Sequence, residues 1–328
     1  MDIDGLASST LRAYCEKKVV DNIYKAIPLF YWMTGRRAKV DAQAGRYTRK
    51  SNTRHQSGGR NLVVPINVDK NTTATSYSGY DVKPTEPVST VKDLEYNWKL
   101  TTVAVVISDE EKDQNTGKEA VWSLLDWKIE EGEMSLFEKF NEWLFGDGTG
   151  NDNKDPLGLK ALVNTTGTIG GLSRTTYTIL QCQADATAMA LAISGGTGSL
   201  TNMYNNLWKQ NAIWRPDTHV TTQTLAEKYE SLLQPHMRLT SKELGELGYD
   251  YLQFKGAPVL FDDLCDAGYW YMLNTKFLYP VVDPRYDFKD IPFRKPVNQE
   301  VSVGYIKWRG NFVCSNFQRQ GRLTAKTA

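Results

Sequence analysis

Cysteine, histidine and long hydrophobic runs are scarce in this sequence. Its four cysteines, Cys15, Cys182, Cys265 and Cys314, lie far apart and form no C-x-x-C pair. This spacing argues against a zinc knuckle or a disulfide framework and suits a reducing compartment. The three histidines are too few and too scattered for most metal or acid–base sites. No apolar run approaches the roughly 20 residues of a membrane span, and the acidic, polar N-terminus shows no signal peptide.

An excess of charge of one sign is also missing. The 328 residues include 39 basic and 38 acidic residues, so the net charge is +1. A protein that binds nucleic acid over its whole surface usually has a clear basic excess, which disfavours that class. The hydrophobic share of 41% and the charged share of 23% are those of an ordinary globular protein rather than a disordered chain.

The balanced total hides three charged segments. Arg36–Arg60 contains eight basic residues and one acidic residue, a net charge of +7. Asp109–Asp155 contains fourteen acidic and five basic residues, a net charge of −9, and Arg294–Ala328 has a net charge of +6. Such runs are either solvated faces or complementary surfaces between identical subunits.

The first third of the chain predicts a helix followed by a long hairpin. The amphipathic pattern of Leu11–Ile27 indicates a helix that stops at Pro28. Leu62–Val68 and Ser89–Ile107 are typical of strands, and the polar segment Asn71–Pro87 lies between them. Isolated hairpins are marginal in water, so we expect this one to pack on something else.

The strongest local signal lies at Lys118–Phe145. Apolar residues recur there at three- and four-residue steps, which predicts one helix with an acidic opposite face. Thr116 and Glu119 are spaced as a capping box, and Gly146 is expected to be the C′ glycine. Such a helix would be about 42 Å long and would suit a strut across a sheet.

Short helices and strands alternate in the second half of the chain. Three helices and three strands are expected there: helices at Gln183–Ile193, Leu200–Ile213 and Thr222–Leu233, and strands at His219–Val220, Pro258–Phe261 and Tyr269–Leu273. Val301–Trp308 and Asn311–Phe317 are predicted to form a hairpin across Arg309-Gly310. Without a βαβ rhythm, this mixture predicts an α+β fold.

No motif in the sequence predicts catalysis. The glycines of Gly146-x-Gly148-x-Gly150 follow a helix, whereas a phosphate loop must open one. Read as an EF-hand, the same loop has Asp152 where glycine is required and Gly158 where the closing glutamate is required. We therefore assign no catalytic, cofactor-binding or metal-ligating residue and expect no enzyme and no cofactor.

Several motifs occur in the order typical of one known family. They are Pro28-Leu29-Phe30 after an arm helix, Gly58-Gly59-Arg60-Asn61-Leu62-Val63-Val64-Pro65, the helix Lys118–Phe145, Trp143–Gly150 with Pro156-Leu157-Gly158-Leu159, and Phe254–Leu260 with Tyr271-Met272-Leu273-Asn274. In this order and spacing, nearly the whole chain resembles the major capsid proteins of tailed bacteriophages, which have the Hong Kong 97-type fold.

The resemblance implies an α+β fold with an N-terminal arm, an extended β-hairpin (the E-loop), a long spine helix, and peripheral and axial domains. The expected divisions are the arm at 1–35, the E-loop and peripheral-domain strands at 36–107, the spine helix and peripheral domain at 108–175, the axial domain at 176–265, and the return strands to the peripheral domain at 266–328.

The function implied by the resemblance is structural. Such a protein self-assembles as hexamers and pentamers into an icosahedral shell in the cytoplasm of the bacterial host, and it is located in the virion. Expected partners are itself, a scaffolding protein, portal and decoration proteins, and the packaged double-stranded DNA, touched non-specifically on the inner face, but no membrane. Since no long charged segment precedes the arm, we expect a separate scaffold or a removed leader.

Two other functions stay open at this point. One is the shell of an encapsulin-type nanocompartment, which is a protein of the same fold. The other is a soluble hydrolase that uses the Asp147-bearing loop with carboxylates of the acidic helix.

The segregated charges predict contacts between subunits. In the resembled fold the hairpin lies over the neighbouring subunit, so its basic base would meet the acidic helix. The predicted contacts join arginines of one subunit to glutamates of the next: Arg46, Arg49 and Arg54 to Glu130, Glu133 and Glu138. The alternative is that both faces are simply solvated.

Overall fold

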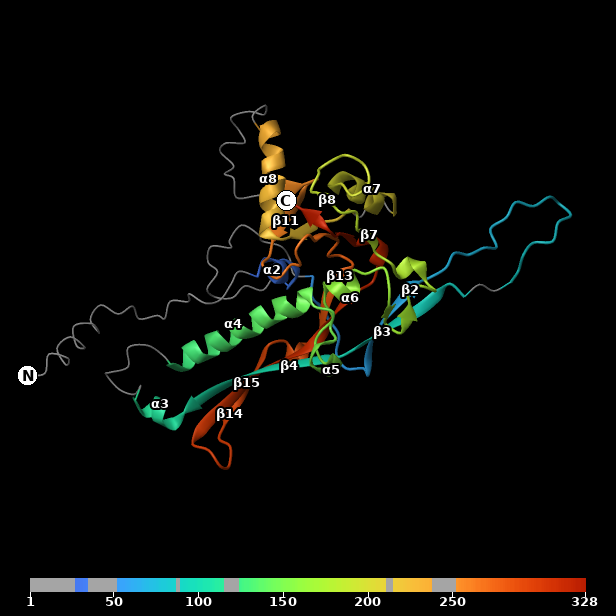
Figure 1. Ribbon diagram of the computed structural model, residues 1–328. Helices are drawn as coiled ribbons and strands as arrows, with labels where there is room; N and C mark the ends of the chain where they lie inside the picture. Colours follow the sequence, from blue (N-terminus) through green and yellow to red (C-terminus); the bar gives the residue numbers. More distant parts are fainter. Residues whose placement is uncertain (1–26, 35–51, 87–88, 115–123, 211–214, 238–251) are drawn as a thin grey trace, which may run out of the picture.

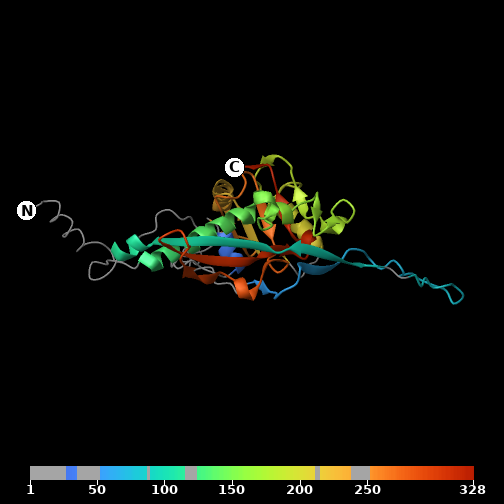
Figure 2. The same cartoon turned by 90° about the horizontal axis from the view of Figure 1, so that it is seen from below.

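The computed structural model describes residues 27–34, 52–86, 89–114, 124–210, 215–237 and 252–328. A body of helices and sheets carries a narrow arm that extends far to one side, and a second view confirms that the arm leaves the body entirely (Figures 1 and 2). The mixture of helices and mostly antiparallel sheets confirms the predicted α+β class.

One sheet has five strands, two of them long, and is called the larger sheet because its strands contain more residues than those of the six-stranded second sheet. The long strand β15 (Val301–Cys314) lies at its centre. Its antiparallel neighbours are β13 (Leu278–Val282), β14 (Lys289–Arg294) and β4 (Lys99–Ser108), and β1 (Arg54–His55) runs parallel to β13. The first half of β15 lies between β4 and β14, and its second half pairs with β13. One strand therefore ties together segments from both halves of the chain.

The hairpin predicted across Arg309-Gly310 is wrong, because β15 continues straight through both residues. A Cβ atom at Gly310 would lie 2.5 Å from the carbonyl oxygen of Val281 and 2.6 Å from the ring of Trp308. Glycine is present because two backbones and a ring meet there, which is a common reason for glycine inside a strand.

The long helix α4 (Leu124–Phe145) crosses one face of this sheet (Figure 1). Gly132, Leu136 and Phe140 lie on its buried face as predicted, and a Cβ atom at Gly132 would come within 3.1 Å of Val105. The predicted end of the helix is confirmed, whereas its predicted start and capping box lie outside the described residues. The residue after the helix, Gly146, donates its N–H to Trp143 O (3.0 Å) but does not adopt the left-handed conformation of a C′ glycine.

A short helix, α2 (Pro28–Thr34), packs beside α4. Pro28 begins this helix, since the N–H group that proline lacks is not needed in the first turn. Phe30 is buried and stacks on Phe140, with the ring centroids 5.5 Å apart. The expected helix Leu11–Ile27 lies outside the described residues, apart from Ile27 itself.

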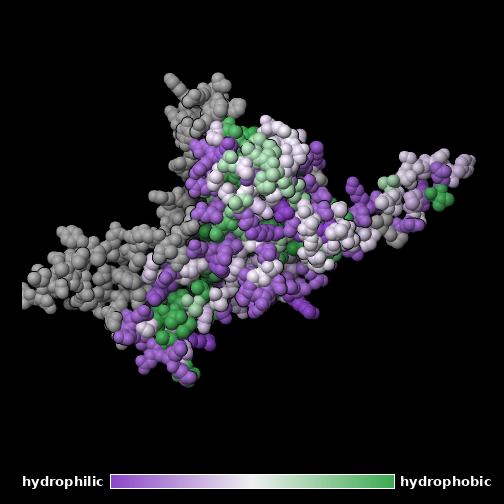
Figure 3. Space-filling view, in the orientation of Figure 1, coloured by the Kyte–Doolittle hydropathy of each residue, from purple (hydrophilic) through white to green (hydrophobic). Residues whose placement is uncertain are grey.

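The arm is the predicted hairpin. Strands β2 (Asn61–Asn67) and β3 (Val91–Asn97) pair antiparallel over their full length. Leu62, Leu94 and Tyr96 are buried where the arm joins the body, and the side chains farther out are exposed or only half-buried. In the space-filling view the arm is a narrow projection with a mostly hydrophilic surface (Figure 3).

The second sheet forms the upper part of the body in Figure 1. Its strand order is β10 (Gln253–Phe254), β11 (Ala257–Phe261), β9 (Thr218–Thr221), β12 (Trp270–Leu273), β16 (Gly321–Leu323) and β7 (Gln183–Asp185). Helices α7 (Leu200–Gln210) and α8 (Gln223–Met237) pack on this sheet over a separate apolar core. These helices and the three strands predicted in this region are confirmed.

The helix predicted at Gln183–Ile193 is wrong. This segment forms β7 and β8 (Met189–Ala190), which run parallel to β16 and to the C-terminal strand β17 (Lys326–Thr327). Pairing with strands more than 130 residues away outweighs the local helical preference.

The remaining elements are short. They are α3 (Asp109–Gln114), α5 (Gly150–Asn153), α6 (Leu159–Leu162), β5 (Thr168–Ile169), β6 (Leu172–Ser173) and the 3-10 helices η2 (Thr178–Leu180), η3 (Pro284–Tyr286) and η4 (Phe317–Arg319).

Candidate functional site: the arm and its root

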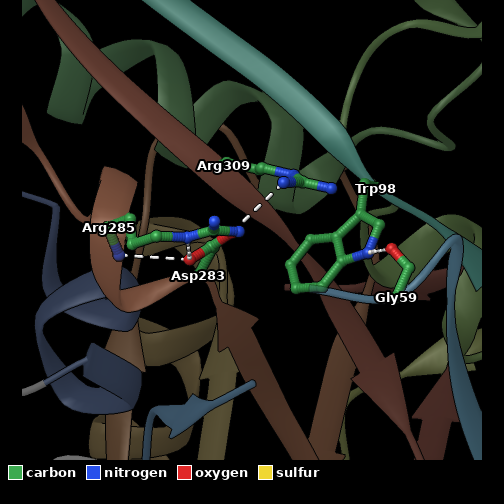
Figure 4. A network of polar contacts seen from close by, with 5 residues as sticks. All are labelled: Gly59, Trp98, Asp283, Arg285 and Arg309. Carbon is green, nitrogen blue, oxygen red and sulfur yellow. Dashed lines mark hydrogen bonds and ion pairs between the residues drawn. The ribbon is translucent and has the colours of Figure 1, made fainter. Parts of the chain in front are cut away.

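The arm is anchored by a buried carboxylate at the end of β13. Asp283 is fully buried, and Arg285 donates to it from Nε (3.1 Å to Oδ1) and Nη2 (2.9 Å to Oδ2). Arg309 of β15 donates to the same Oδ2 at 3.2 Å (Figure 4). The hydrogen bonds from Arg285 hold the pKa of Asp283 below its ordinary value. The carboxylate therefore stays ionised and fixes both guanidinium groups.

Arg309 connects this network to the arm. Its guanidinium lies 4.7 Å from the ring centroid of Trp98, the residue between β3 and β4. Trp98 in turn donates from Nε1 to the carbonyl oxygen of Gly59 at 3.1 Å, on the opposite limb of the arm (Figure 4). Gly58 and Gly59 both have positive φ, +74° and +84°, which glycine alone adopts without strain. The network thus sets the direction in which both limbs leave the body.

The tip of the arm exposes apolar side chains, whereas the root of the arm buries a polar network. Tyr80 and Val82 are 102% and 96% exposed. A turn holds them out, since the N–H of Asp81 donates to Ser78 O (2.9 Å) and the N–H of Ser78 donates to the Asp81 carboxylate (2.8 Å). No core forms under these two apolar side chains in the described part of the chain. An ordered turn that presents apolar groups to solvent is suited to contact with another molecule.

Only some of the residues in the predicted charge contacts belong to the described part of the chain. Arg46 and Arg49 lie outside the described residues. Arg54 lies on β1, where its guanidinium stacks 3.6 Å above the ring of Tyr279.

The three glutamates lie along α4, and each is half-buried: Glu130, Glu133 and Glu138. Their contact with arginines of a neighbouring subunit stays a prediction.

In the loop after α4, Asp147 is held within a turn. The Asp147 carboxylate accepts hydrogen bonds from the backbone N–H (2.9 Å) and the hydroxyl (2.7 Å) of Thr149, and these bonds lower its pKa. A carboxylate held in this way closes a turn and is a poor proton donor.

Within the described residues, no group of three or more histidine, cysteine, aspartate or glutamate residues could hold a metal ion. Nor is any described helix long and apolar enough to cross a membrane.

Sequence reasoning missed the residues that build the root. One signal was present, because Asp283-Pro284 is typical of a helix N-cap followed by N1 proline, and the Asp283 side chain does cap η3. Nothing in the sequence indicated that Arg309 and Trp98 would meet, since they are far apart along the chain.

A buried arginine was also missed. Arg174 is 2% exposed, and its guanidinium donates to the carbonyl oxygens of Ala161, Leu162, Thr166 and Leu180 at 2.7–3.3 Å. Burial lowers its pKa. One side chain therefore holds together the loops that pack against the root of the arm, where the N–H of Glu95 donates to Gly170 O at 3.1 Å.

This chain is similar to known proteins in its structure but not in its sequence. No protein-family model matches the sequence, and no curated protein matches it by sequence. The structure is similar to a chain of the cyanophage A-1(L) capsid asymmetric unit, with a TM-score of 0.69, 15% identity and coverage of 96% of both chains. It is also similar to the SrpI encapsulin of Synechococcus elongatus PCC 7942, with a TM-score of 0.60, 10% identity and coverage of 99% of this chain and 96% of that one.

A third similar structure is the capsid of an empty GTA particle, with a TM-score of 0.59, 11% identity and coverage of 95% of both chains. All three similarities extend over nearly the full length, so they include the arm, the long helix and both sheets. The chain therefore has the Hong Kong 97-type fold of tailed-phage capsid proteins.

Proposed function

We propose that this chain is the major capsid protein of a tailed bacteriophage, a structural protein that assembles into the shell of the virion. The full-length similarity to phage capsid chains supports the proposal. The observation that carries it is the arm, whose tip is ordered but has no core beneath it. A two-stranded hairpin is marginal alone, whereas it gains apolar contacts when it lies over a neighbour in a closed symmetric shell.

The test is particle formation. Purified protein, alone or with a scaffolding protein, should form closed shells built of hexamers and pentamers. Electron microscopy and mass photometry would detect them. A stable, unassembled monomer across salt and scaffold conditions would contradict the proposal.

A second candidate is an encapsulin-type compartment, because the encapsulin covers 99% of this chain. The two candidates differ in what the shell contains. A phage capsid is filled with double-stranded DNA, while a compartment is filled with protein cargo. Nuclease-protected DNA in particles from infected cells would support the capsid, and protein-loaded particles of one small size would support the compartment.

Partners and domains follow from the same proposal. We infer contacts with a scaffolding protein, with portal and decoration proteins, and with packaged DNA on the inner face, and assembly in the host cytoplasm. The axial domain would comprise 176–265 and the peripheral domain would include the long helix and the larger sheet. Limited proteolysis of unassembled subunits would test the boundaries.

Charge pairing between subunits is proposed for Arg46, Arg49 and Arg54 with Glu130, Glu133 and Glu138. A single exposed pair contributes only about 0–1 kcal/mol, but the contact repeats around each ring and is weakened by salt everywhere at once. Changing the glutamates to lysine should lower the assembled fraction at low salt. Changing the arginines to glutamate in the same protein should restore part of it.

A further inference from the structure

Strand β4 of the larger sheet has one unpaired edge. The strand runs from the arm root to α3 (Figure 1) and pairs antiparallel with β15 over all ten residues, Lys99–Ser108. No described strand pairs with its other edge. The backbone N–H and C=O groups on that edge can therefore hydrogen-bond to a strand of another molecule.

The other long outer strands carry features that prevent such pairing. Strand β2 contains Pro65, and strand β3 contains three charged residues. Strand β14 contains Pro292 and shifts its register between Ile291 and Arg294. Charged side chains, prolines and bulges on an outer strand all hinder the addition of a further strand.

Strand β4 lacks these features beyond its first residue. From Leu100 to Ser108 it contains no charged residue, no proline and no register shift. Val105 faces α4 near Gly132, so residues of the opposite parity point away from the helix. Two of these, Leu100 and Val106, are 72% and 45% exposed. A long, apolar and unprotected edge of this kind promotes pairing with another chain.

A second copy of β4 fits this edge. Antiparallel pairing of two identical strands about Val103 places Leu100 of each copy opposite Val106 of the other. In the same register Thr102 lies opposite Ala104. The two large apolar side chains that β4 exposes most then cover each other on both sides of the symmetry axis, and the uncharged segment brings no like charges together.

Pairing of this kind is isologous, because both copies contribute the same residues. An isologous contact stops at two copies, whereas a head-to-tail contact continues until it closes a ring. A shell built of rings needs a contact between rings as well as contacts within each ring. A twofold contact at the β4 edge is suited to the first of these tasks.

We propose that β4 of one subunit pairs antiparallel with β4 of a subunit in the adjacent ring, in a register centred on Val103. Two larger sheets are thereby joined into one continuous sheet across a twofold axis. The inference rests on the proposed function and identifies a surface that joins rings into a shell.

Disulfide trapping in assembled shells tests the register. The test protein carries Thr102→Cys and Ala104→Cys in a background with Cys15→Ser, since the other three cysteines are buried. Residues directly opposite each other have Cβ atoms about 4.5–5.5 Å apart, and diagonal neighbours about 7–8 Å, whereas a disulfide needs about 3.5–4.5 Å. The matched controls are the two single variants, in which each cysteine meets its counterpart only on the diagonal.

After mild oxidation, the double variant should give covalent dimers in roughly tenfold excess over either single variant. Both disulfides join the same two subunits, so dimers should be the only crosslinked species. A ladder up to pentamers and hexamers would indicate a head-to-tail contact and would overturn the inference. A dimer yield no higher than that of the single variants would overturn it as well.

A second measurement uses charge instead of cysteine chemistry. Leu100→Glu and Val106→Lys should each lower the yield of shells roughly tenfold, and both should keep the melting temperature of the unassembled subunit, because both side chains are exposed. The protein with both changes should recover most of the yield, since each glutamate then faces a lysine of the adjacent subunit. The two positions lie about 20 Å apart along one strand, so the new charges cannot pair within a chain.

The matched control is Val297→Lys, which places the same charge on a fully exposed valine outside β4 and should assemble like wild type. The inference is overturned if the doubly charged protein assembles no better than the single variants, or if Val297→Lys loses as much yield as Val106→Lys. Absence of shells from wild-type protein would overturn the proposed function and this inference with it, whereas normal shells without the dimer would overturn the inference alone.

Discussion

In the body of this protein, large side chains such as Phe140, Trp270 and Phe312 are almost completely buried, whereas at the arm tip Tyr80 and Val82 are completely exposed. Buried side chains therefore stabilise the hydrogen-bonded strands of the body, whereas no buried side chains stabilise the arm tip. In the body, sheets are stabilised by apolar contacts that the chain makes with itself. In the arm, the polar network at the root determines direction, and stabilisation of the tip has to come from another molecule.

The largest effect is expected from the body core. Phe140 is 0% exposed and contacts the rings of Phe30, Trp143, Phe288 and Trp308. Phe140→Ala should lower the free energy of unfolding of the subunit by about 3–5 kcal/mol, because it leaves a cavity among rings that cannot collapse together. Chemical denaturation of unassembled subunits measures this loss, with Tyr80→Ala as the exposed control that should change little.

The second-largest loss of stability is expected when Arg174 is replaced. Arg174→Met keeps much of the length but leaves several buried carbonyl oxygens without a donor, so we expect a loss of about 2–4 kcal/mol. Arg174→Lys should recover only part of it, since an ammonium group cannot reach four carbonyls arranged around a planar guanidinium. Equal stability of the Met and Lys variants would show that packing, rather than the hydrogen bonds, is what matters.

Acid should weaken the second core through His219. This residue is fully buried between the rings of Phe254 and Trp270, and burial lowers its pKa to about 4 from an ordinary 6.5. Because the unfolded chain takes up the proton first, this stability is complete above pH 6.5 and is lost as the pH falls toward 4. The slope should be about 1.4 kcal/mol per pH unit.

Denaturation curves between pH 7 and pH 4.5 would measure the effect of His219. His219→Phe removes the titrating group, so the difference between wild type and variant should grow steadily below pH 6.5. A constant difference over this range would contradict the assignment, because carboxylates titrate equally in both proteins.

A smaller effect is expected at the arm root. Trp98→Ala removes the stacking on Arg309 and the hydrogen bond to Gly59, which together should reduce stability by about 1–2 kcal/mol. Assembly should suffer more than stability, because the arm loses its fixed direction. Trp98→Phe keeps the ring but not the N–H group, so an intermediate result separates the two contacts.

The smallest effect on the subunit is expected at the tip. Deleting Asn71–Pro84 and closing the hairpin with a two-residue turn should leave the free energy of unfolding close to wild type, because the segment contributes almost nothing to either core. Shell formation, followed by electron microscopy, should fail or yield fragile particles. Shells as abundant and as heat-resistant as wild type would show that the arm does not join subunits.

Features with strong local periodicity could be predicted from the sequence. The end of α4, the hairpin β2–β3, and helices α7 and α8 were predicted because regular spacing of apolar residues fixes which face is buried. The wrong predictions concern segments whose structure depends on residues far away in the sequence. Gly310 looks like a turn residue until Val281 and Trp308 occupy the space beside it, and Gln183–Asp185 looks helical until Gly321–Leu323 pairs with it.

At the candidate site, too, some features follow from the sequence alone and others only from the folded chain. The sequence alone determined that the arm tip is polar, turn-rich and poor in core residues, since those are properties of adjacent residues. The root network required the folded chain, because Gly59, Trp98, Asp283 and Arg309 meet only after three strands are in register. The exposure of Leu100 and Tyr305 was likewise decided by tertiary structure, because α4 covers only one face of the larger sheet and strand alternation places these two side chains on the other face.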